Sequence, residues 1–319
     1  MPGSSLSPYV PRLLAEWDAH TSSRVRVVNG SLLSADISGF TALSERLAGI
    51  GRAGAEELTD LLNRCFDGMI ATATRHGGDV LKFGGDALLI LFDGTEHTTR
   101  ACAAAVAMRA GIAQPLVSPR AGRVKLRMSQ GIHSGDFAMF LLQAGHRELM
   151  VTGPGATKTV ECESAANAGE ILLSPAAAEL VEPAWLGETR PDGSVLRRRT
   201  IDLDAFVVDE IAATTDTELA AFVAEAQREQ ITAGVLGEHR QGTVAFVKFS
   251  HTDAVMERDG PEAFAERLDA VATALTRALG ETGVHWLASD VYPDGGKAIL
   301  TAGVPSSSGH DEDDMLHTL

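Results

Sequence analysis

Two aspartates stand at the predicted ends of strands, where carboxylates can hold metal ions. Asp36 follows the Val- and Leu-rich run 24–35, which reads as a strand. Asp86 lies at the tip of a predicted β-hairpin, directly after Gly84 and Gly85. If the two strands are neighbours in one sheet, the carboxylates meet, and cations must neutralise their repulsion.

Oxygen ligands beside a turn suit Mg²⁺ or Mn²⁺, which bind few carboxylates and complete their shells with substrate phosphates. Two such ions roughly 3.5–4 Å apart can activate one oxygen and stabilise the departing one in an in-line phosphoryl transfer. Taken singly, Asp36 could be a helix cap and Asp86 a turn residue. The sequence therefore predicts a two-ion site that depends on the two aspartates lying together.

A turn after Asp36 predicts an anion-binding loop. Ser38 and Gly39 permit a tight turn, and a helix is expected to begin at Thr41 and run to Leu47. A strand that turns through glycine into a helix leaves free backbone N–H groups at the helix start, which can bind phosphate.

The elements around these residues predict an α/β sandwich. An amphipathic helix carries apolar residues at helical spacing from Leu58 to Met69 and ends at Gly77. A hairpin follows over 78–92, then an Ala-rich helix over 98–113. Strands are expected at 125–132, 137–142, 148–152 and 170–173, with a helix over 153–166. This order favours a mostly antiparallel sheet of the ferredoxin-like or palm-type class.

The pattern begins again after a helical connector. A strand and turn over 243–252, an amphipathic helix over 263–278 and a hairpin over 284–300 repeat the first part of the chain. Asp36 and Asp86 are 50 residues apart, and Lys248 and Lys297 are 49 apart, so lysines replace both aspartates in this alignment. We predict a first domain at 1–210, a connector at 211–238 and a degenerate, truncated second copy at 239–319, cut from a longer protein.

Composition limits the partners. The formal charge of −16 argues against binding to nucleic acid or to an anionic membrane surface. No apolar run reaches transmembrane length, and the N-terminus has no secretory signal. Cys65, Cys102 and Cys162 show no metal-binding spacing, and their odd number argues against a disulfide framework. A reducing cytoplasm is the expected location.

Several motifs resemble the class III nucleotidyl cyclases. The similarity covers roughly residues 30–178, and the tandem arrangement is most similar to the soluble, bicarbonate-responsive adenylyl cyclases and their bacterial relatives. The motifs are Asp36-Ile37-Ser38-Gly39-Phe40-Thr41, Leu81-Lys82-Phe83-Gly84-Gly85-Asp86-Ala87-Leu88 and the strand and turn over 127–135.

The resemblance implies a cyclase fold and a two-ion mechanism. Two cyclase copies would pack head to tail, in one chain or between two chains, with composite sites at their interface. One ion would activate the ribose 3′-hydroxyl of ATP or GTP for attack on the α-phosphate, giving a 3′,5′-cyclic nucleotide and pyrophosphate. The implied ligands of the two Mg²⁺ or Mn²⁺ ions are Asp36, Asp86 and the Ile37 carbonyl, and the implied polyphosphate-binding backbone is that of Ser38, Gly39, Phe40 and Thr41.

Other positions depart from the family pattern. The later helix of the family supplies Asn and Arg to a composite site, and Thr157 and Glu161 stand there. Met150 takes the base-reading position, and Ser129 takes that of a frequent arginine. The first copy thus keeps the residues that bind metal and has lost those that stabilise the transition state. This division is expected of a pair of copies with one real site and one degenerate site.

Lys82 has two interpretations. It would belong to the degenerate site, where the soluble family type uses its counterpart to bind bicarbonate, or it pairs with Asp79 or Asp86 as a structural lysine. Bicarbonate activation is doubtful, because Val160 and Glu161 stand near the position of the arginine that such a site also uses.

Two other functions stay open, and a third is disfavoured. A catalytically inactive pseudo-cyclase would bind nucleotide or dimerise to regulate other domains, and a guanylate cyclase would use GTP. A diguanylate cyclase is disfavoured because Ala87 and Leu88, rather than Glu-Phe, follow the Gly-Gly-Asp tip. Residues 1–319 alone are expected to show little or no turnover, because the residues that the second copy contributes would lie beyond Leu319.

Overall fold

The computed structural model describes residues 6–17, 23–143, 145–197, 200, 201, 203, 206, 215–232, 241–280, 282–304 and 307–319. These residues form two compact units. The aspartate unit comprises Asn29–Asp136 and Lys158–Val208, and the tandem unit comprises Met1–Val28, Phe137–Thr157 and Asp209–Leu319. The boundaries predicted at 210 and 238 stay a prediction, and residues 211–214 and 233–238 of the expected connector lie outside the described residues.

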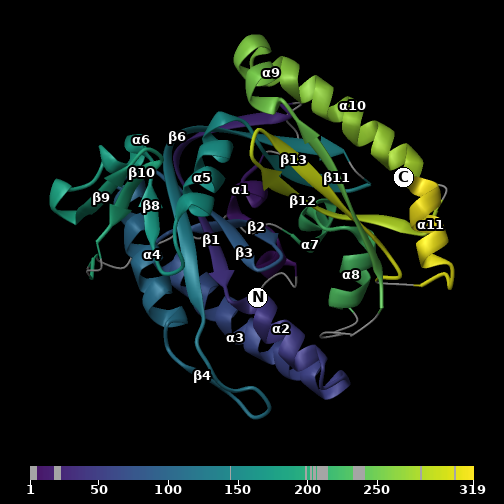
Figure 1. Cartoon of the computed structure of the whole chain (residues 1–319). Coiled ribbons are helices and arrows are strands. Elements are labelled where there is room, and N and C mark those ends of the chain that lie inside the picture. Colours follow the sequence, from purple (N-terminus) through teal and green to yellow (C-terminus); the bar gives the residue numbers. More distant parts are fainter. Residues whose placement is uncertain are drawn as a thin grey trace. The chain divides into compact units, whose positions relative to one another are not determined.

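The aspartate unit is built on a sheet of order β2-β3-β1-β6-β8-β10-β9 (Figure 1). The pairs β1–β3, β2–β3, β8–β10 and β9–β10 are antiparallel, and β6–β8 is parallel. The mostly antiparallel sheet agrees with the prediction. The strands are β1 (Val25–Ser38), β2 (Asp79–Gly84), β3 (Ala87–Asp93), β6 (Arg127–Gln143), β8 (Ile171–Leu173), β9 (Leu186–Arg190) and β10 (Gly193–Leu196).

Three helices form the core of this unit with alternate residues of the central strands. They are α2 (Phe40–Ala48), α3 (Arg52–Arg75) and α4 (His97–Ile112). Because successive strand residues face opposite sides, Leu33, Ala35 and Ile37 of β1 share one face, and all three are buried in one cluster with these helices. The helices expected at 58–69 and 98–113 are confirmed.

The helix α5 (Pro154–Ala165) approaches the sheet at Gly131 of β6. A Cβ atom at Gly131 would lie 2.2 Å from the backbone nitrogen of Glu163 and 2.5 Å from the carbonyl oxygen of Thr159, so only glycine fits. The neighbouring Gln130 faces the other way and donates to the Ala105 carbonyl of α4. Hence α5 and α4 lie on opposite faces of β6.

β6 runs unbroken through residues 133–136, where the sequence predicts a turn between two strands. The turn-like residues are accommodated in the sheet because hydroxyl groups satisfy one another there. Buried Ser134 lies 2.7 Å from the Ser31 hydroxyl and 3.0 Å from that of Thr98. The predicted break was wrong, because the polar residues are paired within the fold and not exposed in a loop.

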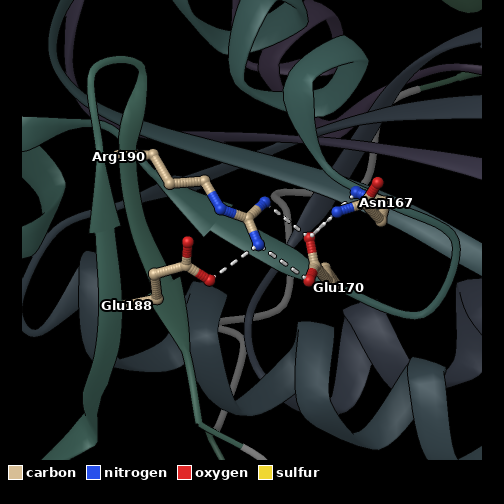
Figure 2. A network of polar contacts seen from close by, with 4 residues as sticks. All are labelled: Asn167, Glu170, Glu188 and Arg190. Atoms are coloured by element: carbon tan, nitrogen blue, oxygen red, sulfur yellow. Dashed lines mark hydrogen bonds and ion pairs between the residues drawn. The ribbon is translucent and has the colours of Figure 1, made fainter.

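An ion-pair network joins β9 to the segment before β8 (Figure 2). The Arg190 guanidinium donates to both oxygens of Glu170, at 2.8 and 3.1 Å, and to Glu188 at 3.1 Å. Asn167 donates to Glu170 from its backbone and its side-chain amide. The remaining elements of the unit are β4 (Leu116–Ser118), β5 (Gly122–Val124), α6 (Pro175–Ala178) and the 3-10 turn η2 (Pro183–Trp185).

The tandem unit holds a three-stranded sheet of order β11-β13-β12. Its core joins Trp286 and Leu300 of this sheet with Phe264 of α10 and with Phe140 and Met150, which lie on the end of β6 and on β7. The elements are β7 (Arg147–Val151), β11 (Thr243–Ser250), β12 (Val284–Tyr292), β13 (Gly295–Ala302), α9 (Thr252–Asp259), α10 (Pro261–Leu279), α11 (Asp311–Thr318), α1 (Arg12–Ala15), α7 (Asp216–Leu219), α8 (Glu225–Thr232), η1 (Ser7–Tyr9) and η3 (Ala220–Phe222).

The internal repeat is present in the element order. The series β11-α9-α10-β12-β13-α11 follows the series β1-α2-α3-β2-β3-α4 element by element. The hairpins differ in register, because Asp36 lies opposite Ala87 whereas Lys248 lies opposite Lys297. The alignment of Lys297 with Asp86 is therefore corrected by the strand pairing.

In the described part of the chain, no helix combines the length and the apolar character that a membrane span requires.

Candidate metal centre

The structure brings Asp36 and Asp86 together. Asp36 lies on β1 opposite Ala87 of β3, and the next residue, Ile37, donates its backbone N–H to the Asp86 carbonyl at 3.2 Å. This pairing places the hairpin tip beside the end of β1, where the Asp86 carboxyl group acts on that of Asp36. The juxtaposition expected from the sequence is found, and the role of both residues as metal ligands stays a prediction.

The carboxyl pair is short of positive charge. Burial raises the pKa of Asp36 to about 6, and the negative charges of Asp86 and Glu163 contribute further. The proton that Asp36 retains up to about pH 6 relieves the repulsion between the two carboxyl groups. A divalent cation would replace that proton and remove the repulsion.

Glu163 is a third carboxyl group of this region, which the sequence analysis missed. It lies on α5, is half-buried and accepts a hydrogen bond of 2.7 Å from the Ser129 hydroxyl. Burial and the charge of Asp86 raise its pKa. No local motif marks Glu163. Only the packing of α5 on β6 brings it toward Asp86 and Asp36, which lie 77 and 127 residues earlier in the sequence.

The donor set fits an ion that shares its coordination with a substrate. Among the residues that the structure describes, no group of three or more His, Cys, Asp and Glu could hold a metal ion by itself. Asp36, Asp86 and the Ile37 carbonyl are oxygen donors, and Mg²⁺ typically takes one or two carboxylates together with water and phosphate oxygens. The protein would thus supply half of a coordination shell.

The predicted anion-binding loop has the expected backbone. β1 ends at Ser38, Gly39 has a φ of +91°, and α2 begins at Phe40. Gly39 has no side chain that could cap the helix, so the first N–H groups of α2 are left for another acceptor. The side chain of Phe40 packs against the core, and Thr41 is exposed.

The other predicted positions lie on different elements and differ in burial. Lys82 is buried on β2 opposite Leu89, and its regulatory role stays a prediction. Glu161 is exposed on α5 and lies 3.3 Å from the Lys158 ammonium group. Met150 and Thr157 belong to the tandem unit, where both are buried.

An open groove of about 600 Å³ lies between α3 and the β4–β5 loop. None of the predicted site residues lines it. Its lining residues are Ala53, Glu56, Glu57, Asp60, Asn63, Arg64, Val117, Pro119 and Arg120.

Comparison with protein families gives one match. The model of the "Adenylate and Guanylate cyclase catalytic domain" family matches residues 25–201, more than half of the chain. Adenylate cyclase type 10 of Rattus norvegicus is 37% identical over 90 residues, which cover 27% of this chain and 6% of that protein. The Homo sapiens protein of the same name is 26% identical over 170 residues, covering 51% and 11%. The chain therefore spans only a small part of these relatives.

Solved structures show a similar fold. A class III adenylyl cyclase-like ATP-binding protein from Pseudomonas aeruginosa has a TM-score of 0.56 at 16% identity, covering 86% of this chain and 64% of that one. The adenylyl cyclase CyaB from the same organism has a TM-score of 0.45 at 26% identity, covering 56% of this chain and 99% of that one. The predicted class III cyclase fold is confirmed, and the repeated element order fits a second, partial copy.

Proposed function

The chain belongs to the family of adenylate and guanylate cyclase catalytic domains, and we propose from that premise that it makes a cyclic nucleotide at a site built on Asp36 and Asp86. The observation that carries the proposal is the carboxyl pair itself, which is short of positive charge beside an uncapped helix start. A divalent cation would neutralise the repulsion between these carboxyl groups and complete its coordination with phosphate oxygens.

We propose ATP as the substrate and cyclic AMP and pyrophosphate as the products. The relatives matched by sequence are named adenylate cyclases, which supports ATP over GTP. Two Mg²⁺ or Mn²⁺ ions would supply charge neutralisation and Lewis-acid activation at the reacting oxygens. The site would be completed by a second cyclase domain, in the same chain or in another, and the proposed location is the cytoplasm.

The residues of this chain would bind and orient the triphosphate. Asp36, Asp86 and the Ile37 carbonyl would hold the ions, and the N–H groups from Ser38 to Thr41 would hold the phosphates. With the substrate so placed, the 3′-oxygen bonds to the α-phosphorus as the bond from that phosphorus to the leaving oxygen breaks. The hydroxyl proton passes to solvent, and pyrophosphate carries away the bonding electron pair.

A second candidate is a non-catalytic nucleotide-binding module. The solved protein that shares the fold over 86% of this chain is named an ATP-binding protein. In this chain, Glu161 lies beside Lys158 at the position where the family resemblance expects an arginine, so the first copy offers no such cation there. A regulatory module would bind ATP through Asp36 and Asp86 without turnover.

One experiment separates these functions. The protein is incubated with Mn²⁺ and either ATP or GTP, and the cyclic nucleotide and pyrophosphate are measured beside nucleotide binding. Asp86→Ala is compared with Asp60→Ala, which alters an exposed carboxylate of α3. Turnover that Asp86→Ala abolishes and Asp60→Ala does not supports the cyclase. The nucleotide that is converted, ATP or GTP, identifies the substrate.

Binding without turnover would favour the regulatory module. If Asp86→Ala and Asp60→Ala bind nucleotide and metal as well as the wild type does, both proposals that rest on Asp86 fail.

A further inference from the structure

The second copy keeps the backbone of the anion-binding loop but fills it differently. β11 ends at Ser250, His251 has a φ of +65°, and α9 begins at Thr252, just as Ser38, Gly39 and Phe40 end β1 and begin α2. Positive φ is unusual for a residue with a side chain, so the repeated geometry is imposed by the fold. The loop after β11 therefore has the same backbone as the loop after β1, in a copy that carries lysines.

Asp294 stands where Asp86 stands in the first hairpin. Each is the second residue of a two-residue turn, between Gly84 and Ala87 in the first copy and between Tyr292 and Gly295 in the second. The Asp294 carbonyl accepts from the Thr252 N–H at 3.4 Å, so it bonds to the start of the neighbouring helix, whereas the Asp86 carbonyl accepts from Ile37 near the end of β1. The second copy thus retains a carboxylate at the tip of its hairpin.

The Asp294 carboxylate caps α9. It accepts a hydrogen bond of 3.2 Å from the backbone N–H of Asp253, in the first turn of the helix. In the first copy the start of α2 has no side-chain cap. An internal carboxylate therefore takes the place that a phosphate would take in the second copy.

Thr157 closes the same loop from α5. Its hydroxyl accepts from the Asp294 N–H at 2.9 Å and donates to the Asp253 carboxylate at 3.2 Å. Close by in sequence, the Thr152 hydroxyl donates to the Gly295 carbonyl at 2.8 Å and lies 3.1 Å from the Thr252 hydroxyl. Thr152, Thr157 and Thr252 are all buried, so these bonds are shielded from water.

Apolar side chains fill the remaining space. Met150 is buried in the core of the tandem unit, and its sulfur lies 3.3 Å from the position of a Cβ on Gly296. The Met256 methyl group lies 2.1 Å from the position of a Cβ on Gly153, so these residues pack without a gap for a side chain. A base or ribose could enter only by displacing this packing.

The two lysines are engaged within the sheet. The Lys297 ammonium group lies 2.8 Å from the Asp290 carboxylate, and the Lys248 ammonium group lies 4.3 Å from the centre of the Tyr292 ring. Both ammonium groups are therefore engaged within the protein, and neither is left to attract a polyphosphate.

We propose that the second-copy loop, residues 250–253 with 293–295, is closed by Asp294 and Thr157 and takes no nucleotide. It serves instead as a fixed joint between the second copy and the segment 137–157 of the first. The chain then holds one nucleotide at most, at Asp36 and Asp86. Only that last point rests on the proposed function.

The first test counts nucleotides. Binding of ATP, GTP and tripolyphosphate with Mn²⁺ is measured by titration calorimetry for the wild type, Asp86→Ala and the double variant Asp86→Ala/Thr157→Trp. We expect one equivalent in the wild type and none in Asp86→Ala. Two equivalents in the wild type, or binding in Asp86→Ala that Thr157→Trp removes, would overturn the inference.

The remaining outcomes separate the two proposals. If the wild type binds nothing, the proposed function fails while the closed loop stands. A single equivalent that survives in both variants argues against the use of Asp86, but not against closure.

The second test measures the joint without any ligand. Thr157→Val removes both hydrogen bonds of its hydroxyl, and its matched control is Thr72→Val, whose exposed hydroxyl bonds only within α3. We expect Thr157→Val to lower the melting temperature by roughly 2–4 °C more than the control, since each lost buried bond leaves partners unsatisfied. Faster amide exchange at Asp294 should accompany it, and equal effects of the two variants would contradict the joint.

Discussion

Asp36 and Asp86 lie close enough for their carboxyl groups to interact, although they are 50 residues apart in the chain. The antiparallel pairing of β1 with β3 fixes this contact, because it sets Asp36 opposite the residue that follows Asp86. In the absence of metal, the pair is a local source of instability at neutral pH.

The stability of the metal-free protein should fall as the pH rises through about 6. The pKa of Asp36 is raised from 3.8 to about 6 by burial and by its acidic neighbours, so the folded state binds the proton more tightly than the unfolded state. The resulting stabilisation is complete below pH 4 and is lost above the folded-state pKa. Urea unfolding in EDTA at pH 5 and pH 7.5 measures it.

Asp36→Asn is the comparison for this experiment, because the amide cannot titrate. We expect the wild type to lose stability relative to Asp36→Asn between the two pH values. A constant difference between the two proteins would contradict the shifted pKa. Added Mn²⁺ should restore the wild type at pH 7.5 and leave Asp36→Asn less affected.

Glu163→Gln should weaken Mn²⁺ binding by roughly threefold to tenfold at pH 7.5, since it removes one nearby negative charge. It should also lower the pKa of Asp36, because the charge of Glu163 contributes to raising it. Glu161→Gln is the matched control on the same helix, where the carboxylate is exposed beside Lys158. Calorimetric titration measures the Mn²⁺ affinity of both variants. Equal affinities would show that Glu163 does not contribute to metal binding.

Gly39→Ala should impair nucleotide binding and destabilise the fold. A residue with a Cβ at φ +91° is strained by about 1–2 kcal/mol, and relief of that strain would move the N–H groups at the start of α2. Gly68→Ala is the control in the exposed middle of α3, where alanine should stabilise by up to about 1 kcal/mol. Denaturant unfolding and ATP binding are the measurements, and opposite signs for the two unfolding energies are expected.

Glu170→Gln should loosen the β9–β10 hairpin. Hydrogen bonds from Arg190 first, and then from Asn167, lower the pKa of Glu170 to about 2, so its stabilising effect is present above about pH 4.5 and lost as the pH falls through about 2. Amide exchange over residues 186–196 at pH 7 should become faster in this variant. Glu188→Gln, which alters the more exposed partner of Arg190, should change it less.

Local spacing along the chain determined the elements that carry the chemistry. Apolar periodicity predicted α3, an Ala-rich run predicted α4, and Gly-Gly-Asp between two apolar runs predicted the β2–β3 hairpin. The repeat of strand, turn, helices and hairpin was visible in the same way. These features depend on residues close together in sequence, so hydrophobic pattern and turn chemistry are sufficient to recognise them.

Long-range packing decided the rest. The apparent turn at 133–136 became part of β6 because Ser31 and Thr98, from elsewhere in the chain, satisfy Ser134. The equivalence of Asp294 with Asp86 required the register of each hairpin, because Asp294 lies 46 residues after Lys248 whereas Asp86 lies 50 residues after Asp36.

The sequence by itself determined that two aspartates, a glycine turn and a second, lysine-bearing copy exist. Only the tertiary structure decided that Glu163 joins the carboxyl pair and that Thr157 meets Asp294 and Asp253. The physical reason is that such contacts depend on how a helix packs on a sheet or how a hairpin turn is placed. Neither leaves a mark in the spacing of residues along the chain.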